Sequence, residues 1–455
     1  MFLIVVGYTM VYGIIVLEPD PVAMEPSAPT VELTPFERDV LEGGRGPVPA
    51  RVMRTVVSYA EALRAERLVE ITGDGHFVIT YALPGIAPSM AMLEELVAAG
   101  LKTCRPFTLD PLPPLDFENW FLEPEQVEKL GKMYRDQALY MEHMSSLGLQ
   151  APDACTCTPY LPQVGNVPRR GDILAWSESA CVAFANSVVG ARSNRNGAIM
   201  DLLCNIVGRV PLSGLLTDEG RKATRRIEVA TESLPSPQLL GAAIGRHVIA
   251  DVPFITGLDR RLEPTGARST LDYLHEMGAA AATAGAVGLF HVEGITPEAI
   301  DDGEGVLLAG YDTYRIDDEV LHELEVGFPV PWGEDGVAPH KCFVGCPHLS
   351  LEQLRWWAEA ILAGLGERGI GRVRVPTTLA AAPGVLRAFE ESTALAGRLR
   401  EAGVRVSPGC AMQVFDDDLS AGEAIITNSS KLRTYTHARY FRDEEIVRIV
   451  VEGNV

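Results

Sequence analysis

Three lone cysteines, each in a turn punctuated by glycine or proline, are the residues of this chain best suited to metal chemistry. Cys157 is followed by Thr-Pro-Tyr, Cys346 lies within Gly-Cys-Pro-His, and Cys410 ends Pro-Gly-Cys. They lie far apart in the sequence and have no CxxC spacing, which argues against zinc ribbons and ferredoxin-type clusters. Separate loops could instead each bring one soft thiolate to iron. Three protein thiolates would leave a metal position open to substrate.

Two alternatives to this ligand set stay open from spacing alone. The three cysteines could be unrelated turn residues, because one sequence does not show that they meet in the fold. Cys155 lies two residues before Cys157 and is a competing ligand.

Two segments could bind an anionic group of a substrate. Arg192 and Arg195 lie in a glycine-bounded turn and could clamp a carboxylate or phosphate. Residues 427–431, Thr-Asn-Ser-Ser-Lys, offer hydroxyls, an amide and a lysine after a predicted strand. Each segment also has a plain structural explanation. The arginines could favour the C-terminal end of a helix dipole, and the second segment could be a helix N-cap with a surface lysine.

Two histidines differ in the role that their sequence positions indicate. His348 follows Cys346 closely and could orient a substrate hydroxyl or donate a proton. His291 ends an apolar stretch, a position more typical of a satisfied core histidine.

The elements that must position these residues are clearest in the last third of the chain. Strands and helices alternate there, which predicts a parallel sheet with covering helices. This pattern puts Cys346 and Cys410 just past the carboxyl ends of strands, where open α/β sheets bind ligands. We predict strands over 342–345, 373–376, 404–406 and 424–427, and helices over 351–365 and 383–402.

The segment that carries Cys157, residues 151–173, is irregular and long, which is typical of a functional loop. It leads into a helix over 180–189 for which Ser177 is the expected N-cap. Small residues fill this helix and the stretch 279–286, so both can pack closely against another backbone. Residues 327–341 contain several Pro and Gly residues and are the expected hinge between domains.

Length and composition limit the class of protein. The chain has 455 residues, enough for two or three domains, and 47% of them are hydrophobic. A net charge of −22 makes binding to nucleic acid or to an anionic membrane through bulk electrostatics a poor hypothesis. Eight cysteines are too few for a secreted disulfide framework of this length, so we expect reduced thiols in the cytoplasm.

The first 17 residues are apolar and uncharged. They lack a basic n-region and are short for a membrane span, so we interpret residues 1–32 as an unstructured or mis-assigned leader. A weak membrane anchor is the alternative.

A set of short motifs, taken together, resembles the catalytic large subunit of the aconitase X family. They are CTPY, GNVP, RRGD, AWSESACVAFANSVVGARSNRNG, GLFHVEGITPEA, VGCPHLSLEQL, PGCAMQV and TNSSK, in this order. The resemblance spans about residues 33–447. It implies an α/β, aconitase-like multi-domain fold with mixed or parallel sheets, covering helices and a metal site in an interdomain cleft. We place a catalytic region over 33–326 and a second over 342–447.

The resemblance also implies a hydro-lyase with iron or an iron–sulfur cluster held by Cys157, Cys346 and Cys410. Members of the family dehydrate cis-3-hydroxy-L-proline or phosphomevalonate, and we favour the first. In such chemistry the metal polarises the leaving hydroxyl, and a serine alkoxide removes the proton. We assign catalytic candidates to Ser177, Glu178, His348 and Ser430. The candidates for binding the substrate are Arg192, Asn194, Arg195, Asn428 and Lys431.

The family's base-bearing swivelling domain is not matched by any segment, and residues 1–31 are too short to be it. We therefore expect a separate small swivelling-domain subunit as partner, with no nucleic acid and no membrane. A non-catalytic iron-binding or redox-sensing protein is the rival hypothesis, because the same three thiolates would serve it.

Overall fold

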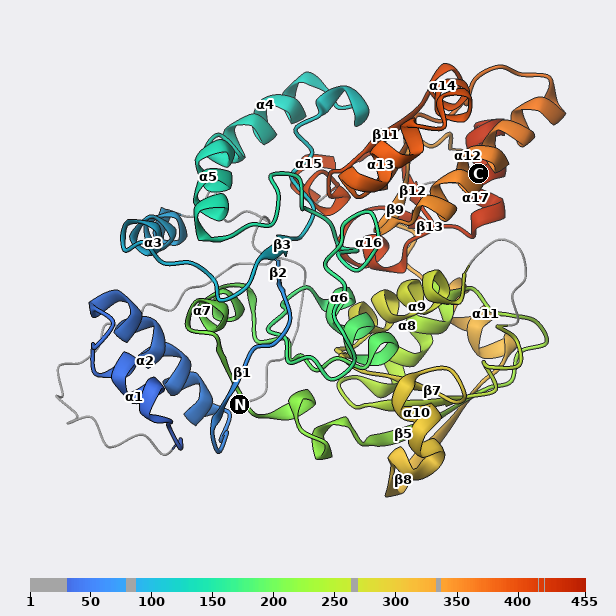
Figure 1. Ribbon diagram of the computed structural model, residues 1–455. Coiled ribbons are helices and arrows are strands. Elements are labelled where there is room, and N and C mark those ends of the chain that lie inside the picture. Colours follow the sequence, from blue (N-terminus) through green and yellow to red (C-terminus); the bar gives the residue numbers. More distant parts are fainter. Residues whose placement is uncertain (1–30, 79–86, 263–268, 333–336, 416, 421) are drawn as a thin grey trace.

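Two parallel sheets with covering helices dominate the right-hand half of the molecule (Figure 1). The computed structural model describes residues 31–78, 87–262, 269–332, 337–415, 417–420 and 422–455. The α/β class with parallel sheets predicted from the sequence is confirmed. The apolar leader lies outside the described residues, and within them no helix is both long and apolar enough to cross a bilayer.

The sheet near the C-terminus has the strand order β11-β10-β9-β12-β13, and every pair in it is parallel. Its strands are β9 (Lys341–Leu349), β10 (Thr377–Ala381), β11 (Val404–Ser407), β12 (Ile425–Thr427) and β13 (Arg439–Tyr440). Its helices are α12 (Leu351–Arg368), α13 (Pro383–Glu390), α14 (Thr393–Glu401), α15 (Asp417–Ser420), α16 (Ser430–Tyr435) and α17 (Asp443–Glu452). Buried side chains of the strands and of α12, α13, α14 and α17 form one apolar core.

Two details of this region differ from the sequence prediction. The strand expected over 373–376 begins instead at Thr377, because Pro376 has no N–H to give to a strand ladder. The helix expected over 383–402 is divided into α13 and α14. Ser392 interrupts it with a non-helical ψ of 59°.

The second sheet has the order β7-β6-β5-β8 and is also parallel. Its strands are β5 (Ala223–Val229), β6 (Pro253–Thr256), β7 (His291–Val292) and β8 (Leu307–Ile316). Its helices are α8 (Pro237–Val248), α9 (Thr270–Ala284), α10 (Pro297–Asp302) and α11 (Asp318–Val326). The predicted close packing of the small residues of α9 is confirmed. A Cβ at Gly241 of α8 would lie 2.2 Å from the Met277 carbonyl oxygen, so only glycine permits this approach.

The N-terminal part is mainly helical and lies on the left in Figure 1. Its helices are α1 (Pro35–Leu41), α2 (Pro47–Ala62), α3 (Ala87–Ala98), α4 (Pro124–Met133), α5 (Gln137–Leu147), α6 (Ser179–Phe184) and α7 (Ala198–Val207). Two small sheets join it, an antiparallel pair of β1 (Leu68–Glu70) with β4 (Arg209–Pro211) and a parallel pair of β2 (Gly75–Phe77) with β3 (Phe107–Leu109).

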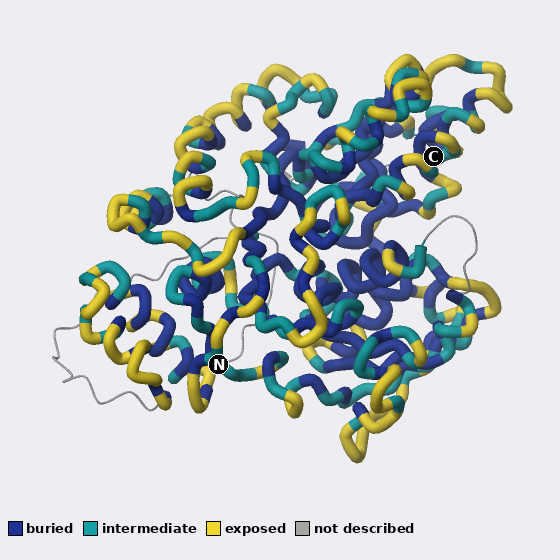
Figure 2. Tube along the Cα trace, viewed as in Figure 1, coloured by how far each residue is buried: buried dark blue, intermediate teal, exposed yellow. Residues whose placement is uncertain are grey.

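Helices α6 and α16 lie near the middle of the molecule, where the three regions meet (Figure 1). Helix α6 packs on α9, and α16 packs between α9 and β9. The helix predicted over 180–189 is present as α6 followed by a π-helical turn, Ala185–Val189, a form often found beside functional sites. Buried residues run through this centre, whereas exposed residues lie on the outer helices (Figure 2).

Candidate active site

The segments that carry the three cysteines singled out from the sequence meet at this junction, where His348, two residues after Cys346, contacts Cys157 Sγ and the Gly409 carbonyl oxygen. Cys157 belongs to the irregular segment before α6, Cys346 to β9, and Cys410 to the turn after β11. The charge of the Cys346 thiolate raises the pKa of the Cys157 and Cys410 thiols. The Lys431 ammonium acts on the pKa of all three thiols in the opposite direction. Lys431 is therefore a cation whose charge acts on all three thiols.

These three cysteines also differ from the rest in exposure. Each keeps part of its surface accessible, whereas Cys155, Cys181, Cys204 and Cys342 are buried and Cys104 is exposed. Desolvation raises the pKa of the Cys157 and Cys346 thiols, and it raises the pKa of Cys410 to about 12. Three thiolates would thus need a nearby positive charge beyond Lys431.

Cys155, the competing ligand, lies elsewhere. It is buried in the core of the N-terminal part and pairs by its backbone with Leu109. Burial and the nearby Asp110 and Asp153 raise the pKa of its thiol. Its surroundings are those of a packed apolar side chain.

Cys346 is presented by an irregularity within β9. The prediction that this strand ends before Cys346 is wrong, because β9 continues to Leu349 after a break in its register with β10. Gly345 has a φ of +116°, and a Cβ there would lie 2.4 Å from the Ala380 carbonyl oxygen. This glycine lets the backbone bulge and turns Cys346 out of the ladder. Cys410, by contrast, lies just past the end of β11, as predicted.

A buried ion pair joins α6 to α16 beside the thiols. Lys431 Nζ donates to Glu178 Oε1 at 2.6 Å, and the Cys181 N–H donates to Glu178 Oε2 at 2.7 Å. Burial opposes ionisation of Glu178, but the lysine and the N–H outweigh it and lower its pKa to about 2. Burial likewise opposes the charge on Lys431, but Glu178 outweighs it and raises the lysine pKa. Both groups are therefore charged at neutral pH.

Glu178, and not Ser177, caps α6. The carboxylate of Glu178 accepts the Cys181 N–H, which is the role expected for Ser177. The Ser177 hydroxyl instead accepts the Val78 N–H at 2.9 Å. The N-cap prediction was one residue early, because the carboxylate gains both a helix N–H and a lysine partner.

His348 holds two cysteine-bearing segments together. Its backbone N–H donates to Cys157 Sγ at 3.1 Å, and its imidazole Nδ1 lies 3.0 Å from the Thr156 hydroxyl. Its Nε2 lies 3.5 Å from the Gly409 carbonyl oxygen, a long contact. Burial lowers the pKa of His348 to about 4, so the imidazole is neutral at pH 7. Thr156 is a contributor that the sequence reasoning missed.

Ser430 carries an unpartnered hydroxyl next to Lys431. Its N–H donates to Gln238 Oε1 at 2.9 Å, whereas its Oγ is buried with no hydrogen-bond partner among the described residues. A buried orphan hydroxyl is costly, which points to a missing water or ligand.

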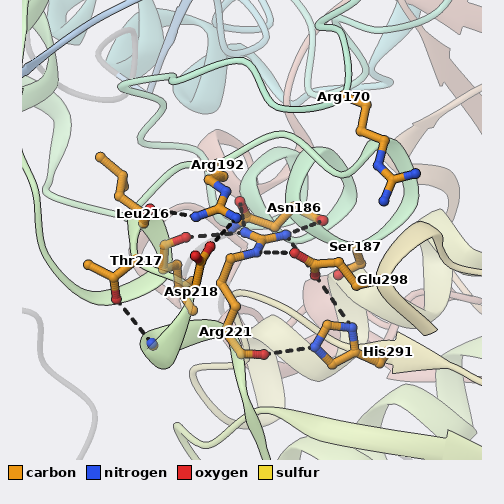
Figure 3. A network of polar contacts seen from close by, with 12 residues as sticks. Arg170, Asn186, Ser187, Arg192, Leu216, Thr217, Asp218, Arg221, His291 and Glu298 are labelled. Carbon is orange, nitrogen blue, oxygen red and sulfur yellow. Dashed lines mark hydrogen bonds and ion pairs between the residues drawn. The ribbon is translucent and has the colours of Figure 1, made fainter. Parts of the chain in front are cut away.

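Arg192 and Arg195 do not form the predicted clamp, because they bind different partners. Arg192 donates to the Leu216 carbonyl and to Asp218, in the network that also contains Arg221 and Glu298 (Figure 3). Arg195 donates to the Ala286 carbonyl at 2.6 Å and lies close enough to Glu178 to feel its charge. Arg195 is thus the arginine on the side of the cysteines, with one backbone acceptor and no carboxylate partner among the described contacts.

The two asparagines proposed to bind substrate serve the chain itself. Asn194 donates to the Ser213 carbonyl at 2.9 Å and accepts the Leu215 N–H at 2.8 Å. Asn428 donates to Asp443 at 2.9 Å. Short-range patterns give no signal of such partners, which come from distant segments. His291 is a core histidine, as predicted, bonded to the Arg221 carbonyl (Figure 3).

The donor chemistry of the three thiols is that of soft ligands, which suit iron. Within the described ranges, no three His, Cys, Asp or Glu side chains gather closely enough to share one metal ion. Lys431 nevertheless acts electrostatically on all three thiols, and the Ser430 hydroxyl next to it in the sequence has no hydrogen-bond partner among the described residues. Thiolates are the usual ligands of iron–sulfur clusters, so Cys157, Cys346 and Cys410 would be the residues to hold such a group, and its positive charge would favour their ionised form.

Comparison with known proteins gives one consistent result. Models for the first and second domains of aconitase X match residues 30–219 and 223–324. The phosphomevalonate dehydratase large subunit of Thermococcus kodakarensis is 33% identical over 334 residues, 72% of this chain and 77% of that one. The cis-3-hydroxy-L-proline dehydratase of Hypocrea jecorina is 28% identical over 89% of this chain and 65% of its own length. The crystal structure of holo aconitase X from Thermococcus kodakaraensis superposes with a TM-score of 0.75 at 27% identity, covering 92% of this chain and all of that one.

Proposed function

Because the chain belongs to the aconitase X family and its homologues are dehydratases, we propose that it is the large subunit of an iron- or iron–sulfur-dependent hydro-lyase. The substrate we favour is cis-3-hydroxy-L-proline or a similar hydroxy acid. Phosphomevalonate is the alternative, which the identity to the archaeal large subunits supports.

The observation that carries this proposal is the contact between the cysteine-bearing segments through His348, whose backbone N–H donates to Cys157 Sγ and whose Nε2 lies 3.5 Å from the Gly409 carbonyl, together with the charge of Lys431 that acts on all three thiols. Three soft donors from three distant segments have no structural need to converge. Iron held by them would act as a Lewis acid on the leaving hydroxyl.

The chain's own groups have separable roles in this proposal. Arg195 binds the substrate carboxylate, because its guanidinium lies within electrostatic reach of Glu178 and has no carboxylate partner among the described residues. Lys431 keeps its charge through Glu178 and partly offsets the rise that burial causes in the pKa of the three thiols. Neutral His348 fixes the segment of Cys157 relative to β9. The Ser430 hydroxyl is free to bond to substrate.

The proton-abstracting base would come from a small swivelling-domain subunit. The name "large subunit" carried by the archaeal homologues supports such a partner. We propose a cytoplasmic complex, since soft thiolates persist in a reducing compartment.

The test is reconstitution under anaerobic conditions with iron, sulfide and the small subunit of a homologous enzyme. We expect dehydration of cis-3-hydroxy-L-proline or of phosphomevalonate by the mixture and little by either part. Iron binding without turnover of either substrate would favour the redox-sensing rival. A sensor would also tolerate Arg195→Ala without functional loss.

A further inference from the structure

Two aromatic side chains beside the proposed site have buried polar atoms that the chain leaves unused. Tyr160, three residues after Cys157, is 8% exposed, and His275, on α9, is 4% exposed. The Tyr160 hydroxyl and His275 Nε2 have no hydrogen-bond partner among the described residues. Each such group is costly to bury, by about 1–3 kcal/mol.

Packing holds the two rings in fixed positions. Tyr160 stacks on Phe184 with ring centroids 3.7 Å apart and an interplanar angle of 11°. The His275 ring meets both of these rings edge-on, at 5.4 Å and 5.9 Å. The unused polar atoms are therefore preorganised and not free to turn toward other partners.

Their surroundings tie both residues to the same site. The charges of Glu178 and Lys431 both affect the pKa of His275. The charges of Cys157 and Glu178 likewise affect the pKa of Tyr160. The Ser430 hydroxyl beside Lys431 is likewise unpartnered. Three buried polar groups without a partner among the described residues thus lie near the Glu178–Lys431 pair.

The chemistry of the two groups is that of neutral hydrogen bonding. Burial lowers the pKa of His275 to about 3, so its imidazole is uncharged at pH 7 and has one donor and one acceptor nitrogen. A phenol likewise donates and accepts. These two neutral groups suit a substrate hydroxyl or amine. They match a carboxylate poorly, whereas Arg195 can bind one.

We propose that Tyr160 and His275 form a substrate-binding edge that hydrogen-bonds the hydroxyl or amine of the hydroxy acid while Arg195 binds its carboxylate. This inference rests on the proposed function. It adds two residues that the sequence reasoning did not select and assigns them a polar group of the substrate.

The test compares two tyrosine-to-phenylalanine changes with opposite expectations. Tyr273 lies on α9 two residues before His275, and its hydroxyl donates to the Pro235 carbonyl at 2.9 Å. Removing this satisfied bond in Tyr273→Phe should lower the unfolding midpoint of the ligand-free protein and leave substrate affinity unchanged. Tyr160→Phe removes an unsatisfied hydroxyl, so the midpoint should stay or rise while affinity falls about tenfold.

Binding is measured by calorimetry on the iron-loaded complex with cis-3-hydroxy-L-proline and with phosphomevalonate, and iron content is measured in parallel. His275→Leu should weaken binding similarly, and His275→Gln, which keeps an N–H near the position of Nε2, should restore part of it. Affinities within twofold of wild type for both Tyr160→Phe and His275→Leu would overturn the inference. Turnover by the wild-type complex decides the proposed function separately, because it does not depend on these variants.

Discussion

The Lys431–Glu178 pair gives the sharpest stability prediction. The two groups are 2.6 Å apart, with side chains only 10% and 5% exposed. Lowering the Glu178 pKa from its ordinary 4.5 to about 2 corresponds to about 3 kcal/mol. Removing the lysine in Lys431→Met leaves a buried carboxylate without its counter-charge, and such losses cost about 3–5 kcal/mol. We expect a deficit of about 3 kcal/mol at pH 7.

The pH dependence supplies a second signature of the same pair. In the wild type the Glu178 pKa is lowered, so its contribution is present above pH 4.5 and is lost as the pH falls toward 2. In Lys431→Met, burial is opposed only by the hydrogen bonds from Cys181, so the Glu178 pKa rises relative to the wild type. The deficit of this variant should therefore shrink between pH 7 and pH 5, as the carboxylate takes up a proton.

The assay is urea denaturation of the chelator-treated protein at both pH values, because bound metal would add its own stabilisation. Glu178→Gln and the double variant complete a cycle, in which the double change should cost less than the sum of the single ones. Lys341→Met is the control variant. Lys341, at the start of β9, forms a similar buried ion pair with Glu423, and this substitution breaks that pair. A deficit for Lys431→Met below about 1 kcal/mol, or one that does not change with pH, would refute the reasoning.

Other substitutions test the site and its scaffold. Arg195→Lys should raise KM at least tenfold with unchanged iron content. Arg192→Lys should raise KM less, because Arg192 already donates to Asp218. Equal increases of KM in steady-state kinetics would contradict this. Gly345→Ala should lower the thermal midpoint by several degrees, because the added Cβ meets the β10 backbone. Gly366→Ala, in an exposed turn of α12 with nothing within 4 Å, should raise the midpoint slightly, and the opposite order of midpoints would be evidence against the role given to Gly345.

The sequence predicted the sheet class because apolar strands and amphipathic helices alternate locally, and β12 and α12 follow that pattern closely. It could not predict how β9 continues past Cys346, because the bulge depends on the contact of Gly345 with β10. The division at 327–341 and the cleft location of the metal stay proposals.

The site was predictable to the extent that residue type signals chemistry. Soft thiols in Gly/Pro turns indicated Cys157, Cys346 and Cys410, and in the structure the charge of Lys431 acts on all three, whereas their role as metal ligands stays a prediction. Partner choice was not predictable, because Asn194 and Arg192 are bound by residues about 20 or more positions away. Orphan atoms such as His275 Nε2 exist only once the surrounding segments are packed.

Iron and sulfide content per chain, measured after anaerobic purification, tests the central claim most directly. The account predicts that Cys157→Ser, Cys346→Ser and Cys410→Ser each lose most of the iron bound by the wild type, because a hydroxyl holds such iron poorly. Cys155→Ala, in the apolar core, should keep it. Wild-type iron content in any one of the three serine variants, or its loss only in Cys155→Ala, would contradict the assignment of the three thiols.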